Sequence, residues 1–217
     1  MKTNTKKLTA ASLLCAFAYI VMLISKVIPE VAGFLQLDLK DVVIVSGGFI
    51  LGPASALIIS FVVSLLELLT VSNTGIIGMI MNLVSTAAFC CTAAIIYKHF
   101  RTVKGAVASL VFGTIALTAV MLLWNYYITP LYMKVPRDVV ISMLIPVFLP
   151  FNLIKGLINS SLTLLLYKPL VKSLSKAHLI NSYTASKGST TISPLPVIGI
   201  VVLIICIPFL LNLMGVI

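Results

Sequence analysis

The sequence predicts an all-α integral membrane protein, built as a bundle of membrane-spanning helices. Of its 217 residues 60% are hydrophobic and only 9% are charged, and the mean hydropathy is +1.20. A soluble domain cannot bury that much apolar surface, whereas helices satisfy their own backbone groups within lipid. The strands of a membrane barrel would alternate apolar and polar residues, and these apolar runs do not.

The apolar runs predict six membrane spans and a seventh after them. The second span is short, contains Gly47-Gly48, and is followed by a tight turn at Gly52-Pro53. The sixth carries Pro146 and Pro150, which predict a short first piece, a break, and a main helix that starts near Pro150. The predicted spans cover residues 8–28, 41–51, 54–71, 76–97, 105–128, 139–167 and 194–217.

The runs also predict how the chain is divided. We expect a six-helix membrane domain at residues 1–178, a linker at 179–193 that is rich in Ser and Thr, and an additional transmembrane helix at 194–217. The first apolar run resembles a signal peptide, with Ala16-Phe17-Ala18 as a cleavage motif. Because it continues to Ile28, we interpret it as a retained first helix. A basic tail follows the sixth span, with Lys168, Lys172 and Lys176.

Charge predicts the orientation of the bundle. With the N-terminus in the cytoplasm, the inner segments carry no acidic residue, whereas the outer loops hold four acids and four cations. This distribution follows the positive-inside rule in a plasma membrane, so the formal charge of +10 does not indicate nucleic-acid binding. An aromatic belt at Trp124, Tyr126, Tyr127 and Tyr132 marks the outer interface. The inner cations are Lys2, Lys6, Lys7, Lys98, Arg101, Lys104, Lys168, Lys172, Lys176 and Lys187.

One cation, Lys155, lies inside an apolar stretch. A charge at that depth costs ~3 kcal/mol, so it normally faces a partner, a cavity or a ligand. Asn152 lies three residues earlier on the same helix face, while Asn125, Glu67 and Asn82 fall in the outer half of other spans. These positions predict a pocket open to the exterior and covered by the loop at residues 30–40. The alternative is a lysine that snorkels to the interface along its own stem.

The sequence carries no sign of catalysis or of a metal site. Cys15, Cys90, Cys91 and Cys206 all fall in apolar spans without the spacing of metal ligands, and His99 and His178 lie in basic segments. A membrane hydrolase or lipid transferase would need a nucleophile and a base, and a scaffold without a ligand would leave Lys155 unexplained. The chain has no phosphate-binding loop, so any ATP hydrolysis must come from partners. We therefore expect a transport subunit, not an enzyme.

Four motifs resemble one known family. They are Leu37-Asp38-Leu39-Lys40-Asp41-Val42, the Gly52-Pro53 turn, Asn125-Tyr126-Tyr127-Ile128-Thr129-Pro130-Leu131-Tyr132 and Pro150-Phe151-Asn152-Leu153-Ile154-Lys155-Gly156. In this order, over about residues 6 to 176, they resemble the riboflavin-specific substrate-binding (S) components of energy-coupling factor (ECF) transporters. The resemblance implies a six-helix subunit that captures its vitamin, works with a transmembrane coupling protein and two cytoplasmic ATPases, and topples in the membrane to release the vitamin inward.

The resemblance also implies the ligand contacts. Asn125, Asn152 and Lys155 would face the carbonyl–NH–carbonyl edge of the flavin ring, to which amides and an ammonium are complementary. Glu67, Asn82 and Asp38 are weaker candidates for the ribityl hydroxyls, since Asn82 would equally join two helices and Asp38 would equally cap the second span. The ring faces would pack on residues such as Phe34, Met79 or Trp124. No cofactor or metal is implied, because riboflavin is the transported ligand. An S component for another vitamin is the nearest alternative.

Small residues on the first span imply a contact with the coupling protein. The family pattern there is a pair of alanines four residues apart, and this chain lacks the strict pair. Ala11 with Cys15, or Ser12 with Ala16, are the nearest equivalents. Packing within the chain is the alternative for each of them. The seventh span and the short loop between the Asn125 and Asn152 motifs depart from the family pattern.

Overall fold

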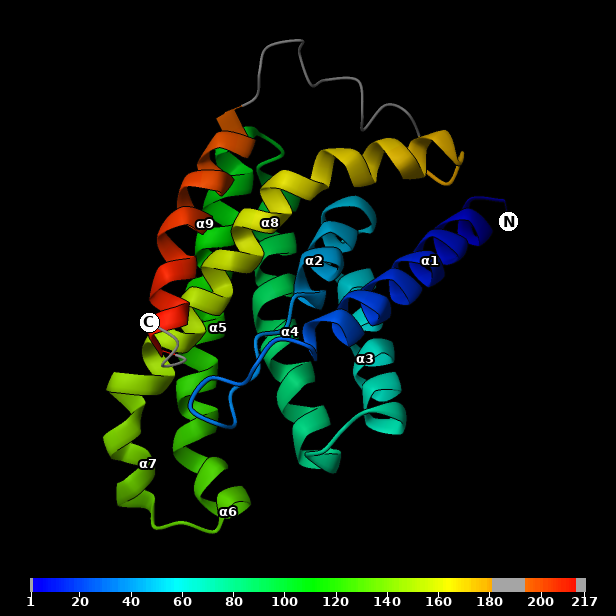
Figure 1. The fold of residues 1–217 in the computed structure, drawn as a ribbon. Helices are drawn as coiled ribbons and strands as arrows, with labels where there is room; N and C mark the ends of the chain where they lie inside the picture. The colour runs from blue at the N-terminus through cyan, green and yellow to red at the C-terminus, as the bar shows by residue number, and fades with distance from the viewer. Residues whose placement is uncertain (1, 181–193, 214–217) are drawn as a thin grey trace.

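The described chain is helical, as the sequence predicted. The computed structural model describes residues 2–180 and 194–213, and in those ranges the only β-type pairing is an isolated bridge between Val31 and Leu35. The helices, shown in Figure 1, are α1 (Lys2–Ser25), α2 (Lys40–Leu51), α3 (Pro53–Thr70), α4 (Gly75–His99), α5 (Val103–Tyr127), α6 (Thr129–Met133), α7 (Arg137–Met143), the π-helix η1 (Leu144–Phe148), α8 (Leu149–Lys176) and α9 (Pro194–Leu213).

Five of these helical stretches are long and apolar enough to cross a membrane. They are α1 from Thr5, α3, α4, α5 and the continuous stretch Arg137–Lys176. Apolar side chains such as Leu8, Ile24 and Ile58 are exposed on their outer faces, where a bilayer would cover them. The chain is therefore a multi-pass membrane protein.

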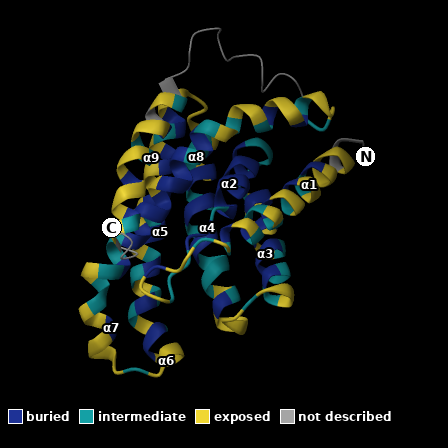
Figure 2. Ribbon diagram, viewed as in Figure 1, coloured by how far each residue is buried: buried dark blue, intermediate teal, exposed yellow. Residues whose placement is uncertain are grey.

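Helix α2 is too short to cross a bilayer by itself. Its 12 residues span roughly 18 Å at 1.5 Å per residue, against about 30 Å of hydrocarbon. Its residues from Lys40 to Phe49 are all buried, and it packs on α1, α3, α4 and α8 (Figure 2). The second predicted span is thus an enclosed central helix. The turn after it uses Gly52 at a φ of +101°, which favours glycine, and Pro53 starts α3.

The sixth predicted span differs from expectation in two places. At Pro146 the chain does not break but passes through the π-helical turn η1, and α8 then starts at Leu149, one residue before Pro150. Helix α8 also continues through Pro169 to Lys176, so the predicted basic tail is helical. Val171 and Leu174 are buried there, which explains why the helix persists beyond the apolar run. Leu174 belongs to the main core cluster of the bundle, whose other members include Leu14, Ile44, Ile59, Phe89 and Leu117.

The seventh predicted span is α9, a helix of 20 residues that packs along α8. Cys206 and Leu210 of α9 form a second core cluster with Phe151, Ile154 and Ile158 of α8 and with Val31 and Leu37 of the α1–α2 connection. This cluster backs the stretch of α8 that carries Asn152 and Lys155. Residues 181–193 of the predicted linker lie outside the described residues.

The two ends of the bundle differ. In Figure 1 the N-terminal start of α1 and the C-terminal end of α8 lie at the upper end, whereas α6, α7 and the α3–α4 connection lie at the lower end. The α1–α2 connection, residues 26–39, runs across the front of the bundle on the lower side (Figure 1). This connection is the covering loop of the pocket described below.

Candidate ligand-binding site

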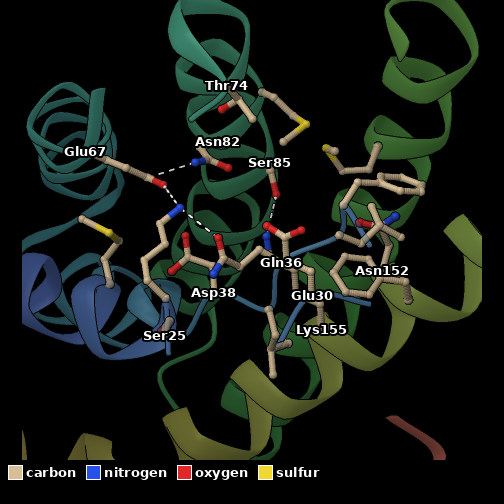
Figure 3. Close-up of a pocket in the computed structure, with 18 of the residues that line it drawn as sticks. Ser25, Glu30, Gln36, Asp38, Glu67, Thr74, Asn82, Ser85, Asn152 and Lys155 are labelled. Atoms are coloured by element: carbon tan, nitrogen blue, oxygen red, sulfur yellow. Dashed lines mark hydrogen bonds and ion pairs between the residues drawn. The ribbon is translucent and has the colours of Figure 1, made fainter. Parts of the chain in front are cut away.

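A polar pocket lies between the helices beneath the α1–α2 connection. It holds about 870 Å³ of space not filled by atoms, part of it open to solvent. Its walls come from α1, α3, α4, α5, α8 and the connection, and the side chains drawn in Figure 3 point into it. All six residues singled out from the sequence line it: Asp38, Glu67, Asn82, Asn125, Asn152 and Lys155.

Lys155 lies in the second turn of α8 and is 7% exposed. Its Nζ donates a hydrogen bond of 3.4 Å to Ser85 Oγ of α4, across the pocket from α8 (Figure 3). The side chain therefore reaches into the pocket and not outward along the helix. The next residue, Gly156, lets α8 approach α5, since a Cβ there would lie 2.6 Å from Thr114 Cγ2. This close approach holds the first turns of α8 against the pocket.

Asn125 and Asn152 are both buried, and each is anchored to its own helix. Asn125 Nδ2 donates to Met121 O and Asn152 Nδ2 donates to Phe148 O, at 2.8 Å in both cases. Asn125 Oδ1 also accepts a hydrogen bond from Thr129 Oγ1 at 2.8 Å. An amide nitrogen carries two hydrogens, so each amide keeps one donor for a further partner. The pair thus offers two oriented N–H groups beside the Lys155 ammonium.

Two acidic residues of the pocket, Asp38 and Glu67, form an ion-pair network with Lys26 and Lys40. Glu67 pairs with Lys26 at 2.8 Å and with Lys40 at 3.3 Å, and it accepts a hydrogen bond from Asn82 Nδ2 at 2.9 Å. Asp38 pairs with Lys40 through its Oδ2, and its Oδ1 accepts from the Lys40 backbone N–H at the start of α2. Asn82 thus joins two helices, as the alternative interpretation expected, while Asp38 lies one residue before the N-cap Leu39, which has no side-chain cap; both still line the pocket.

The ion-pair network ties the α1–α2 connection to the helices. Lys26 Nζ also donates to Gln36 Oε1 at 3.0 Å, and the two lysines that flank the connection, Lys26 and Lys40, both pair with Glu67. From the sequence, Lys26 is one of the four cations counted in the predicted outer loops, and its pairing with Glu67 was missed. The signal that could have revealed it is Glu67 itself, because an acid inside an apolar span normally has a basic partner. Ser85 was also missed, since a single serine in a helix gives no such signal.

The apolar walls differ from those predicted. Phe34 lines the pocket as expected, but Met79 and Trp124 do not. Trp124 packs against the main core cluster instead. Consecutive helical residues point about 100° apart, so Trp124 turns away where Asn125 turns in. The apolar side chains that do line the pocket are Met22, Phe34, Leu35, Leu37, Met81, Met121 and Phe151.

The small residues of α1 face two directions. Ala11 and Cys15 are half-buried and pack against the main core cluster, whereas Ser12 and Ala16 are exposed. Ser12 and Ala16 lie four residues apart, on the outer face that also carries Phe17 and Ile20. The structure therefore separates the two candidate pairs: one packs within the chain, and the other is available to a second helix.

Comparison with known proteins identifies the class. Residues 6–167 match the family model of the substrate-specific component of ECF transporters. The solved structure of the S component of a bacterial ECF transporter superposes with a TM-score of 0.67 at 33% identity, covering 79% of this chain and 98% of that one. The chain therefore belongs to the substrate-specific components of ECF transporters, and it is a transport subunit and not an enzyme.

Three curated proteins similar to this chain are riboflavin transporters. The riboflavin transporter RibU of Staphylococcus aureus is 32% identical over 179 residues, which are 80% of this chain and 94% of the relative. The riboflavin transporter FmnP of Bacillus subtilis is 28% identical over 188 residues, 81% and 99% of the two chains. RibU of Streptococcus thermophilus is 33% identical over 184 residues, 80% and 87% of the two.

Proposed function

We propose that this chain is the riboflavin-capturing subunit of an ECF transporter in the plasma membrane. Its family supports the transport role, and the riboflavin transporters among its relatives support the vitamin. The observation that carries the proposal is Lys155, a buried ammonium in a polar pocket, with Asn125 and Asn152 lining the same pocket. A buried cation flanked by oriented amides suits a neutral ligand that is rich in carbonyl acceptors.

The flavin would be held at two kinds of surface. Asn125, Asn152 and Lys155 bind the carbonyl–NH–carbonyl edge of the ring, and Phe34 and the pocket methionines pack on its faces. Glu67, Asn82 and Asp38 stand where ribityl hydroxyls would find acceptors and donors. These three side chains already form hydrogen bonds or ion pairs within the protein. They would bind the ribityl hydroxyls through the donors and acceptors that those bonds leave free.

The partners follow from the family and from the faces of the bundle. A transmembrane coupling protein docks on α1 at Ser12 and Ala16, the exposed pair, and two cytoplasmic ATPase subunits supply the energy that this chain has no motif to supply. The N-terminus lies in the cytoplasm and the pocket opens outward. The vitamin-binding domain is the six-helix part, predicted at residues 1–178, and α9 is an additional membrane helix; most of the predicted linker at 179–193 and the last residues of the predicted helix at 194–217 lie outside the described residues.

An uptake experiment tests the proposal. Cells that can neither make nor import riboflavin would express this chain together with an ECF coupling protein and its ATPases, and labelled vitamins would be supplied singly. Uptake of riboflavin, and not of thiamine, biotin or folate, is the expected result. Uptake of another vitamin in place of riboflavin would overturn the assignment of the ligand and keep the class. An Asn152→Ala chain serves as the variant that should lose uptake although it still inserts.

A further inference from the structure

A second buried charge lies next to the pocket, on Asp41 in the first turn of α2. Its side chain is 0% exposed. Oδ1 accepts a hydrogen bond of 2.7 Å from Thr86 Oγ1 of α4, while Oδ2 is buried and has no hydrogen-bond partner among the described residues. A carboxylate oxygen in such surroundings is costly unless a positive charge compensates it.

Asp41 and Lys155 form hydrogen bonds with two consecutive residues of α4. Ser85 of α4 accepts from Lys155 Nζ, and Thr86, the next residue, donates to Asp41 Oδ1. The helices that carry the two charges, α2 and α8, also pack against each other. The Lys155 ammonium, carried by α8, and the Asp41 carboxylate, carried by α2, thus both contact one short stretch of α4.

The buried charges around the pocket pair off except for these two, and the remaining charged residue that lines it, Glu30, is exposed. Asp38 and Glu67 each pair with a lysine, and Lys26 and Lys40 each pair with an acid. Of the buried ionisable groups in the described residues, Asp41 and Lys155 are in no ion pair. Opposite charges interact strongly inside a low-dielectric bundle even beyond contact distance. Once the ion-paired groups are set aside, these two residues are the buried charges of opposite sign that remain to balance each other.

We propose that Asp41 is the counter-ion of Lys155 and thereby a positioning residue for the pocket. Its carboxylate attracts the Lys155 ammonium and holds it at the Ser85 side of the pocket, where it binds the ligand. Asp41 itself does not line the pocket and touches no ligand. The inference rests on the proposed function only for the identity of the ligand, because the pairing of charges is a property of the bundle.

A double-mutant cycle tests this pairing. Asp41→Asn, Lys155→Met and the double variant would be purified in detergent, and their thermal midpoints measured without riboflavin. Each single variant leaves one charge uncompensated and should lower the midpoint, whereas the double variant should be more stable than Asp41→Asn alone. If Asp41→Asn gives no folded protein, recovery of folded protein in the double variant supports the pairing. A double variant as unstable as the sum of the singles, or one that never folds, overturns it.

Riboflavin binding supplies the second readout. Asp41→Asn should raise the riboflavin Kd roughly tenfold or more. In the Lys155→Met background the same change should raise Kd no further, since Asp41 acts through Lys155. In the control background Lys26→Met, whose lysine pairs with Glu67, Asp41→Asn should keep its full effect. Equal effects in both backgrounds would contradict the proposal. If the wild type does not bind riboflavin, the proposed ligand is wrong, while the thermal cycle still decides the pairing.

Discussion

At the scale of the residue, Lys155 is the side chain on which ligand affinity should depend most. It is a buried cation whose one hydrogen-bond partner in the described protein, Ser85 Oγ, is neutral and 3.4 Å away. A ligand carbonyl would replace or supplement that long bond. A hydrogen bond to a charged group contributes ~2–3 kcal/mol, so Lys155→Ala should raise the riboflavin Kd roughly 30- to 150-fold. Titration of purified protein measures it. Lys134→Ala, at an exposed outer lysine, should leave Kd unchanged. Equal affinity for Lys155→Ala and wild type would place Lys155 outside the site.

Glu67 acts at the same scale on the covering loop. It is 4% exposed and pairs with Lys26 and Lys40, which belong to opposite ends of the α1–α2 connection. Removing one partner of a buried pair costs about 3–5 kcal/mol, because the other charge stays buried. Glu67→Gln should therefore lower the thermal midpoint by several degrees and speed riboflavin dissociation. Asp138→Asn, at an exposed acid of α7, is the matched control and should change neither quantity. A Glu67→Gln protein with wild-type dissociation would show that the network does not hold the loop.

At the scale of the element, α1 carries the face proposed for the coupling protein. Ser12 and Ala16 are exposed and small, so a helix of the partner can approach closely there. Ala16→Leu should abolish most uptake through steric exclusion, while the riboflavin Kd stays within a few-fold of wild type. Phe112→Leu, which changes a large exposed residue of α5 for another, should leave uptake largely intact. Uptake by Ala16→Leu at the wild-type rate would move the docking face elsewhere.

Most membrane-spanning helices and the polar pocket wall could be predicted from the sequence. Long apolar runs predict α1, α3, α4 and α5, because a helix that crosses the bilayer must be apolar over about 20 consecutive residues. Intramembrane polar residues such as Asn125, Asn152 and Lys155 point inward because lipid does not tolerate them, so the polar wall of the pocket was predictable.

What sequence reasoning missed depends on packing between distant segments. An apolar residue is accepted by lipid and by the core alike, so nothing in the sequence chooses Met81 over Met79 for the pocket wall. The pairing of Lys26 with Glu67 joins residues 41 positions apart, and only the packing of α1 on α3 brings them together. The helical course of residues 168–176 likewise depends on the contacts of Val171 and Leu174 with the bundle.

At the scale of the whole molecule, function requires a fixed orientation. The segments proposed to face the cytoplasm hold the unbalanced cations, and the pocket opens at the opposite side of the bundle. With single reporter cysteines in a background whose own cysteines are replaced, Lys134→Cys should react with an impermeant thiol reagent in intact cells. Lys104→Cys should react only after lysis. The reverse pattern would turn the pocket toward the cytoplasm and contradict capture from outside.

The most direct test of the central claim is a riboflavin titration of the purified wild-type protein. Trp124, the one tryptophan of the chain, directly precedes the pocket residue Asn125, so a bound flavin lies near enough to quench its fluorescence. Protein from a riboflavin-replete host should be yellow, and ligand-free protein should show saturable quenching of tryptophan emission as riboflavin is added. Colourless protein whose emission does not change with riboflavin would contradict a flavin site around Lys155.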